Sequence, residues 1–465
     1  MPVFLWTDVL IFLLLTAVVA FALYARRREH LRAPWRQVGR SRTAMASVVV
    51  LGVYVVIGLL DSMHYRPSLP SSSEGEAREY STEVLSVFDR LVTHLRVMEE
   101  KTYSAPFASH LFVKETVETG DGGSARIYPR LVHGGRHLED PATDRSTDIL
   151  ATASMAAVAG LLVWLGLSGA FVAAWARRHR RGFGAAVAEI LDARSVVRWP
   201  PMLVSVGVCL VLISVVVALS FDYHVLGTDK VGEDVLYQSL KSVRTGLVIG
   251  TLTTLVMLPF AILLGIMAGY FRGWVDDLIQ YLYTTLNSIP SVLLIAAAIL
   301  ILQVYLDGHA QDYSSVVERA DLRLLFLCLI LGITSWTGLC RYLRAESLKL
   351  REMDYVQAAT ALGSTDFAIL GRHILPNVMH IVLITVVLDF SGLVLAEAVL
   401  SYVQIGVDPT MHSWGNMINS ARLEMAREPI VWWSLSAAFL FMFTLVLAAN
   451  LFSDTVRDAL DPRLR

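Results

Sequence analysis

Residues 344–377 read RAESLKLREMDYVQAATALGSTDFAILGRHILPN, a polar stretch between two long apolar ones from which the fold class follows. Its first part consists of good helix formers, which predict a helix. Gly363 follows Leu362 as a helix stop, and Pro376 limits where the next helix begins. A helix, a glycine and a second helix form a rigid protruding element that another protein can bind.

Nine apolar segments along the chain are long enough to cross a membrane. A bilayer core requires about 20 apolar residues in a helix. Of the 465 residues, 55% are hydrophobic and 17% are charged, whereas a soluble domain carries about 25% charged residues. We therefore predict an all-α polytopic membrane protein, with spans near 4–24, 44–61, 149–175, 201–221, 245–270, 277–303, 323–340, 378–402 and 431–451.

Basic residues between the spans predict the orientation of the chain. Short basic loops stay on the cytoplasmic side of a membrane. With nine spans, every basic region falls on that side if the N-terminus is outside and the C-terminus inside. The basic residues are Arg26, Arg27, Arg28, Arg32, Arg36, Arg40 and Arg42; Arg177, Arg178, Arg180, Arg181, Arg194 and Arg198; Arg341, Arg344, Lys349, Arg351 and Arg372; and Arg457, Arg463 and Arg465. The first span has no basic residue before it and is predicted to be an uncleaved anchor.

The spacing of the spans predicts four parts. They are two N-terminal spans with a basic cytoplasmic loop at 1–61, a small periplasmic insertion domain at 62–148, a third span with a basic cytoplasmic linker at 149–199, and a compact six-span unit at 200–465, whose long cytoplasmic loop lies at about 342–377.

The insertion at 62–148 has its own local pattern. It opens with a linker rich in proline and serine, formed by Pro67, Pro70 and serines 71–73. Apolar residues at helical spacing predict an amphipathic helix over 83–100. Further on, β-branched runs and Gly-rich turns within 109–132 predict a short hairpin.

The loop at 344–377 is similar to a known motif. In the EAA loop, Glu-Ala-Ala is followed by three residues, Gly, nine residues and Ile-x-Leu-Pro. Here Gln357-Ala358-Ala359, Gly363 and Leu375-Pro376 stand at those spacings, with Gln357 in place of Glu and His373 in place of Ile. The chain thus resembles the inner-membrane permeases of ATP-binding-cassette importers, in the version found in the C-type permease subunit of oligopeptide, dipeptide and nickel importers.

Further motifs extend the resemblance over residues 200–465. They are HVLGTDKVGEDVL (224–236), GYFRGWVDD (269–277), NSIPSVLL (287–294), LAEAVLSYVQIGVDPTMHSWGNMI (395–418) and NLFSDTVRDALDPRLR (450–465). Gly232-Glu233-Asp234 departs from the Gly-Arg-Asp of the family. The usual subunit has six spans, so residues 1–199 are an atypical N-terminal extension.

The resemblance implies a fold, partners and sites. The fold would be the six-helix type I importer permease core, with three extra N-terminal transmembrane helices and a small periplasmic domain, in a bacterial inner membrane. The partners would be a second permease subunit, P-loop ATPase subunits that hold ATP and Mg, and a periplasmic substrate-binding protein that delivers small peptides. The residues implied in coupling to the ATPase are Asp354, Gln357, Ala358, Ala359, Gly363, Leu375 and Pro376, and those implied in contacting the binding protein are Leu226, Gly227, Asp229 and Trp414.

Several residues inside the apolar segments invite a functional interpretation. An acid within a span costs a few kcal/mol and usually faces a cavity or a partner. Glu397 matches a Glu of the family pattern, while Asp389 either lines a cavity or makes an interhelical hydrogen bond. Trp432 and Trp433 are predicted to be anchors at the membrane interface. Gly246, Gly250, Gly265 and Gly269 allow close helix approach, more readily within the chain than between subunits.

Missing motifs narrow the function. The chain lacks the P-loop pattern, G-x-S-x-G and H-E-x-x-H. We therefore expect a transport subunit rather than an enzyme, with no cofactor, metal or nucleic acid bound by this chain. The alternatives are a membrane sensor or scaffold with a periplasmic ligand domain, a secondary transporter, or an importer of nickel or antimicrobial peptides.

Overall fold

The computed structural model describes residues 1–26, 35–69, 79–118, 124–192, 197–309, 311, 313 and 315–460. Within these residues, the chain has nine helices that are long and apolar enough to cross a membrane. The predicted number of spans is therefore confirmed. Some residues used in the predictions lie outside the described ones, namely Arg27, Arg28, Arg32, Pro70, serines 71–73, Arg194, Arg463 and Arg465.

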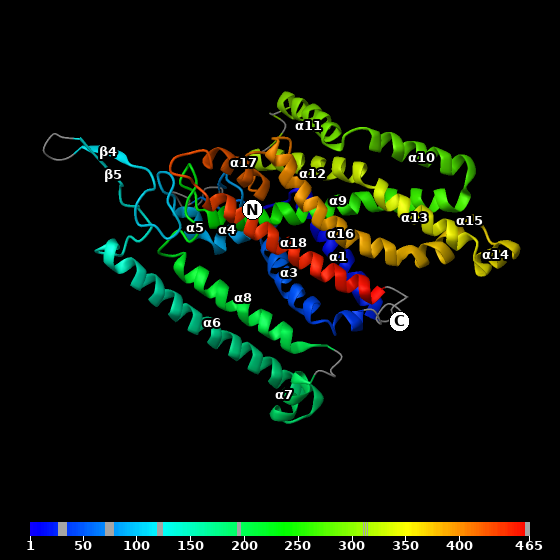
Figure 1. Cartoon of the computed structure of the whole chain (residues 1–465), viewed down its shortest axis with the longest axis horizontal. Coiled ribbons are helices and arrows are strands. Elements are labelled where there is room, and N and C mark those ends of the chain that lie inside the picture. Colours follow the sequence, from blue (N-terminus) through cyan, green and yellow to red (C-terminus); the bar gives the residue numbers. More distant parts are fainter. Residues whose placement is uncertain are drawn as a thin grey trace. The chain divides into compact units, whose positions relative to one another are not determined.

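The long helices follow the apolar segments (Figure 1). They are α1 (Trp6–Arg26), α3 (Arg42–Asp61), α6 (Pro141–His179), α8 (Trp199–Leu219), α9 (Val235–Phe271), α11 (Ser291–Gly308), α12 (Val316–Ser335) continued by α13 (Thr337–Arg351), α15 (Asp366–Ile369) continued by the π-helical turn η2 (Leu370–Ile374) and α16 (Leu375–Tyr402), and α18 (Trp433–Leu460). Shorter helices are α4 (Val87–Leu91), α5 (Thr93–Val97), α7 (Phe183–Leu191), α10 (Gly273–Ser288), α14 (Asp354–Ala361) and α17 (Trp414–Glu424).

Several helices begin or end away from the predicted span boundaries, and two of these differences have a clear local reason. The sixth span was expected over 277–303, but α10 ends at Ser288 and α11 begins at Ser291. Ile289 and Pro290 separate the two helices, since a residue before proline is disfavoured in the helical region. The third long helix begins at Pro141 rather than near 149, because Asp140 accepts a hydrogen bond from the backbone of Ala142 as an N-cap.

The chain forms two compact units. Unit 1 comprises Met1–Val3, Arg28–Thr245 and His412–Thr455, and unit 2 comprises Phe4–Arg27, Gly246–Met411 and Val456–Arg465. Residues of the predicted insertion thus pack in the same unit as the first part of α9. The four-part division predicted from the sequence stays a prediction.

The insertion within unit 1 contains strands and short helices. Two of its strands, β2 (His64–Tyr65) and β3 (Leu85–Ser86), form an antiparallel sheet with β1 (Pro2–Val3) of the N-terminus, in the order β1-β2-β3. The predicted hairpin is confirmed by β4 (Glu115–Glu118) and β5 (Ser124–Ile127), which pair antiparallel. The single helix expected over 83–100 is wrong. A capping box between Ser86 and Asp89 delays the helix start, and Val92, with φ −106° and ψ 29°, separates α4 from α5.

Glycines set the helix packing inside each unit. In unit 1, a Cβ on Gly207 of α8 would lie 2.8 Å from the Trp164 indole of α6. In unit 2, a Cβ on Gly265 would lie 2.8 Å from the Cys340 carbonyl, and Gly269 meets the backbone of Arg344 in the same way. Gly265 and Gly269 therefore serve packing within the chain, as the sequence suggested, and Gly207 does the same in unit 1.

One predicted interface anchor is wrong. The Trp433 side chain is buried in unit 1, with only 2% exposure. Its indole N–H donates to the Thr228 carbonyl at 2.9 Å, and its ring meets Phe112 edge-to-face at 4.8 Å. Trp432 is 54% exposed. Trp432 comes just before α18, which begins at Trp433, and the planes of the two rings are 79° apart. The two adjacent side chains therefore lie in different environments.

Candidate functional site

Between α13 and α16, the first short helix, α14, ends next to Gly363, as the sequence predicts. α14 runs from Asp354 to Ala361, and Gly363 has a φ of +80°. The Gly363 N–H donates to the Thr360 carbonyl at 3.0 Å, and the Ser364 N–H donates to the Ala359 carbonyl at 3.1 Å. This left-handed turn satisfies carbonyls at the helix end and suits a residue without a Cβ.

The exposed face of the loop carries two large apolar side chains. Leu362 is 87% exposed and Phe367 is 83% exposed, on either side of Gly363. This pair is not among the residues predicted to couple to a partner, although apolar residues flanking a loop glycine are a usable signal. Large apolar side chains that are this exposed are candidates for a surface where another protein docks.

The predicted coupling residues fall into two groups. Asp354, Gln357, Ala358, Gly363 and Pro376 are exposed, while Ala359 is buried and Leu375 packs against the core of unit 2. The first group is placed to meet a partner, whereas Ala359 and Leu375 hold the loop to the helices beneath it.

A rigid base supports the exposed face. Val356, Ile369 and Ile374 are buried in one cluster with Leu343 of α13 and Val378 of α16. Their contacts fix α14 and α15 on the ends of long helices, because a close-packed core resists small displacements.

Pro376 lies in the first turn of α16, as predicted, but the expected break before it is absent. Helical backbone runs from Asp366 through η2 into α16. The Leu375 N–H donates to the Leu370 carbonyl five residues earlier, in a π turn. A wider turn gives the proline ring room next to the preceding turn, since proline lacks an N–H and crowds the carbonyl four residues before it.

Polar contacts tie the loop to neighbouring helices of unit 2. The Arg344 guanidinium donates to both carboxylate oxygens of Asp276 on α10, at 2.5 and 2.6 Å. These hydrogen bonds outweigh burial, which would raise the pKa of Asp276, and hold that pKa below its usual range. The Tyr270 hydroxyl of α9 donates to Asp366 at 2.8 Å. The loop is thereby linked to α9, α10 and α13.

The two acids of α16 differ in environment. Glu397 is 2% exposed and accepts a hydrogen bond from the Ser401 hydroxyl at 2.7 Å. Asp389 is half-buried. Eight residues separate them, which is about 12 Å along a helix. The prediction that either acid lines a pathway stays a prediction.

The four candidates for contacting a binding protein lie in unit 1. Gly227, with a φ of +74°, has no room for a Cβ next to the Ser104 carbonyl, and Trp414 is 1% exposed. Both residues support the segment from within. Leu226 and Asp229 are half-exposed, and Asp229 accepts the Val231 and Glu233 N–H groups at 2.9 and 3.0 Å. The proposed contact stays a prediction for all four.

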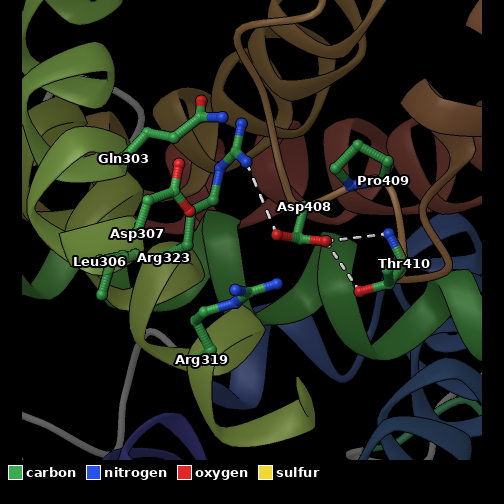
Figure 2. A pocket seen from close by; sticks show the side chains of 8 residues that line it. All are labelled: Gln303, Leu306, Asp307, Arg319, Arg323, Asp408, Pro409 and Thr410. Atoms are coloured by element: carbon green, nitrogen blue, oxygen red, sulfur yellow. Dashed lines mark hydrogen bonds and ion pairs between the residues drawn. The ribbon is translucent and has the colours of Figure 1, made fainter. Parts of the chain in front are cut away.

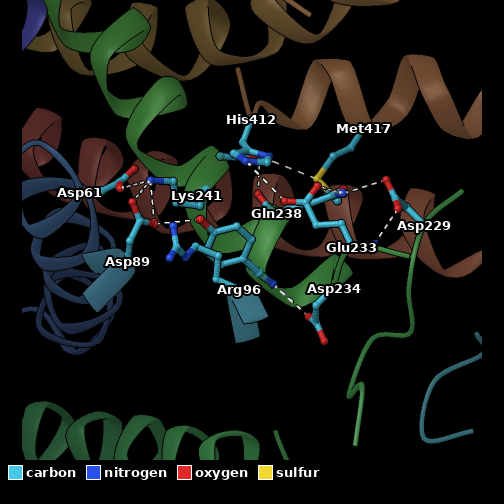
Figure 3. A network of polar contacts seen from close by, with 12 residues as sticks. Asp61, Asp89, Arg96, Asp229, Glu233, Asp234, Gln238, Lys241, His412 and Met417 are labelled. Carbon is cyan, nitrogen blue, oxygen red and sulfur yellow. Dashed lines mark hydrogen bonds and ion pairs between the residues drawn. The ribbon is translucent and has the colours of Figure 1, made fainter. Parts of the chain in front are cut away.

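A buried lysine in unit 1 lies between two acids of the N-terminal extension (Figure 3). Lys241 of α9 lies 2.6 Å from Asp61 and 3.0 Å from Asp89. Burial would raise the pKa of Asp89, but the Lys241 charge and the hydrogen bonds that the carboxylate accepts lower that pKa. No local pattern in the sequence indicates this cluster, because both acids are more than 150 residues away from Lys241.

A second buried cluster joins the insertion to the segment before α9. The His224 Nδ1 lies 2.7 Å from Asp234 and its Nε2 lies 3.5 Å from Glu100. Burial lowers the pKa of His224, but the two carboxylates outweigh it and raise that pKa to about 9. Burial raises the pKa of Glu100, yet His224 and the N–H groups of Val132, His133 and Gly134 bring it to about 2. The His224 imidazolium and the Glu100 carboxylate are thus both charged at neutral pH.

Glu233 stands where the family pattern has arginine, and its surroundings are acidic. Its carboxylate accepts from Gln238 at 2.7 Å and lies 3.6 Å from His412 (Figure 3). Burial first, and then the charges of Asp229 and other acids, raise the pKa of Glu233 to about 7. Burial lowers the pKa of His412 to about 4.

Glu233→Gln is expected to stabilise the protein at high pH only. A Glu with a usual pKa of 4.5 and a folded pKa of about 7 does not lower the free energy of unfolding below pH 4.5, where it is protonated in both states. This lowering grows as pH rises from 4.5 to 7 and is complete above 7. Since water reaches part of this side chain, the gain at pH 8 should be on the order of 2 kcal/mol. Thermal unfolding of the purified protein at pH 4 and pH 8 measures it. Equal shifts in Tm at both values would assign the effect to packing instead.

The C-terminal half of the chain is similar to several known membrane proteins. The family model described as "Binding-protein-dependent transport system inner membrane component" matches residues 261–465. Glutathione transport system permease protein GsiD of Pectobacterium atrosepticum is 32% identical over 244 residues, covering 52% of this chain and 73% of that protein. Dipeptide transport system permease protein DppC of Lactococcus lactis subsp. cremoris is 29% identical over 242 residues, covering 52% of this chain and 64% of that protein.

Oligopeptide transport system permease protein OppC of Mycobacterium bovis is 30% identical over 242 residues, covering 52% of this chain and 77% of that protein. Among solved structures, the inward-facing MetNI methionine ABC transporter is similar at 16% identity, with a TM-score of 0.34, and covers 49% of this chain and 94% of that chain.

Proposed function

Because this chain belongs to the family of binding-protein-dependent transport system inner membrane components, we propose that it forms half of the pathway of an ATP-driven importer of small peptides. The family consists of transport components, so the chain is a multi-pass membrane permease subunit and not an enzyme. The sensor or scaffold alternative is not favoured.

The observation that supports coupling to an ATPase is the exposed face of the loop. Leu362 and Phe367 project on either side of Gly363, next to the exposed Asp354, Gln357 and Ala358. A partner with an apolar groove would bury both large side chains. We assign that groove to a P-loop ATPase subunit, since the EAA-type loop is the docking element in the resembling importers.

The proposed mechanism is a rigid-body movement. Partner ATPase subunits would hold ATP and Mg, and ATP binding there would close the nucleotide domains. The movement reaches the docked α14, whose buried base connects it to α9, α13 and α16. Packed elements with two discrete arrangements can transmit such a shift between sites.

Small peptides are the proposed cargo. The similar proteins GsiD, DppC and OppC carry names that refer to glutathione, dipeptide and oligopeptide transport. A periplasmic binding protein would deliver the peptide, and a second permease subunit would complete the pathway.

The proposed orientation in a bacterial inner membrane follows from the basic loops. The N-terminus would be periplasmic and the C-terminus cytoplasmic, with the EAA-type loop inside. The insertion at 62–148 would then face the periplasm, where it could present a surface to the binding protein.

Copurification tests the assembly. The tagged chain, extracted in a mild detergent, is expected to bring down a second permease and P-loop ATPases. Replacing Leu362 and Phe367 with aspartate should remove the ATPases and keep the second permease, because charged side chains do not enter an apolar groove. Leu423→Asp, at a leucine that is 71% exposed on α17, is the matched control and should change nothing. Recovery of the chain alone, or with signalling proteins, would contradict the importer assignment.

A further inference from the structure

An open pocket of about 250 Å³ lies in unit 2, apart from the coupling loop (Figure 2). Three segments line it: the end of α11, the first turns of α12, and the chain that follows α16. Its polar lining consists of Gln303, Asp307, Arg319, Arg323, Asp408 and Thr410. By the proposed orientation it faces the periplasmic side.

The guanidinium of Arg323 is only partly neutralised. Its side chain is 10% exposed, and its Nη1 lies 3.5 Å from the Asp408 carboxylate, which is long for a hydrogen-bonded ion pair. Its buried Nε has no hydrogen-bond partner among the described residues. The other oxygen of Asp408 accepts from the Thr410 backbone at 3.0 Å and hydroxyl at 2.7 Å. A buried cation with an unused donor gains from an additional acceptor.

The other residues that line the pocket indicate which chemical group that acceptor would be. Arg319 lies one helical turn before Arg323 on the same side of α12 and makes no ion pair within the described ranges. Two guanidinium groups favour a carboxylate, whose two oxygens match their planar donors. Asp307, an exposed acid of α11 that also lines the pocket, repels a simple anion. A ligand with both a carboxylate and an ammonium group satisfies the arginines and the acid together.

We propose that this pocket binds a short peptide, with its terminal carboxylate on Arg323 and Arg319 and its ammonium group near Asp307. The inference rests on the proposed function, because it assigns to the permease a direct contact with the zwitterionic peptides it would transport. The volume suits the ends of a short peptide rather than a folded partner.

The test measures binding to the full chain in lipid nanodiscs, without ATPase or binding protein. The probes are the dipeptide L-alanyl-L-alanine, its C-terminal amide, and sodium acetate, each followed by saturation-transfer NMR. The dipeptide is expected to bind at least about tenfold more tightly than the amide, since the amide loses charge-assisted hydrogen bonds. Acetate should bind more weakly than the dipeptide, because it meets Asp307 without an ammonium group.

Substitutions then assign the contact. Arg323→Gln should abolish the preference for the carboxylate, and Arg323→Lys should retain only part of it, because lysine keeps the charge without the planar fork. Arg319→Gln, at a half-exposed position, should weaken dipeptide binding several-fold with little risk to folding. Asp307→Asn should reduce the difference between the affinities for the dipeptide and for acetate. The control is Arg90→Gln, which removes an exposed arginine of unit 1 and should leave binding unchanged.

Two results would overturn the inference. One is equal affinity of the wild-type chain for the dipeptide and its amide. The other is wild-type affinity for the dipeptide in both Arg319→Gln and a correctly folded Arg323→Gln. The proposed function fails separately. If the assembled importer takes up peptides equally well with and without a free terminal carboxylate, the proposed role of the pocket is rejected and the proposed transport function is retained. If the chain binds the dipeptide in a carboxylate-dependent way but recruits no ATPase, the proposed peptide site is retained and the proposed transport function is rejected.

Discussion

Gly363→Val is expected to reduce peptide uptake by the assembled importer by about tenfold or more, a change typical of lost coupling between sites. Gly363 has a φ of +80°, and no atom lies within 4 Å of the position that a Cβ would take. Valine therefore meets no clash, but a β-branched residue avoids the left-handed region. The turn must rearrange, which displaces Leu362 and Phe367 relative to the base of the loop.

The matched control for this substitution is Gly371→Val. Gly371 is also exposed in the loop region and has an open Cβ position, but its φ is not positive. Uptake and peptide-stimulated ATP hydrolysis are measured at equal amounts of membrane-inserted protein. Normal uptake by Gly363→Val, or an equal loss in both variants, would mean that the left-handed turn does not set the docking geometry.

Lys241→Met is expected to destabilise the folded protein by about 3–5 kcal/mol, the range for breaking a buried ion pair from one side. The Lys241, Asp61 and Asp89 side chains are only 13%, 3% and 5% exposed. Methionine fills a similar volume but leaves two acids in unit 1 without their cation. Thermal unfolding of the detergent-purified protein and the yield of monodisperse material report the loss.

Two comparisons isolate the charge effect of Lys241→Met. Lys101→Met removes a lysine that pairs with Glu115 at 2.8 Å but is 70% exposed, and it should cost less than about 1 kcal/mol. Adding Asp61→Asn and Asp89→Asn to Lys241→Met should recover much of the stability, because no unpaired charge then remains. Equal costs for the two lysine variants would contradict a buried, structurally required ion cluster.

The EAA-type loop at 344–377 shows how far local sequence rules reach. The stop at Gly363 follows from backbone stereochemistry, which a single residue type expresses. The division of the EAA-type residues into exposed and buried ones does not follow, since Ala358 and Ala359 are adjacent alanines with opposite environments. The direction of a helix face is fixed only when its neighbours are in place.

The spans and the hairpin were predictable because their signals are local. Apolar length specifies a spanning helix, and alternating β-branched residues around glycines specify a hairpin. Boundaries depended on single capping or proline residues, so 277–303 and 83–100 were misjudged as unbroken helices.

The number of membrane-crossing helices, the family and the helix stop at Gly363 of the EAA-type loop could all be inferred from the order of the residues alone. Which charges meet became visible only in the folded chain. Lys241 finds Asp61 across 180 residues, and the Thr7 backbone of α1 donates to Asp321 of α12 across 314. Apolar length and turn geometry act within a few residues, whereas a buried charge is stabilised by any partner that folding brings within about 4 Å. No spacing in the chain encodes such a partner.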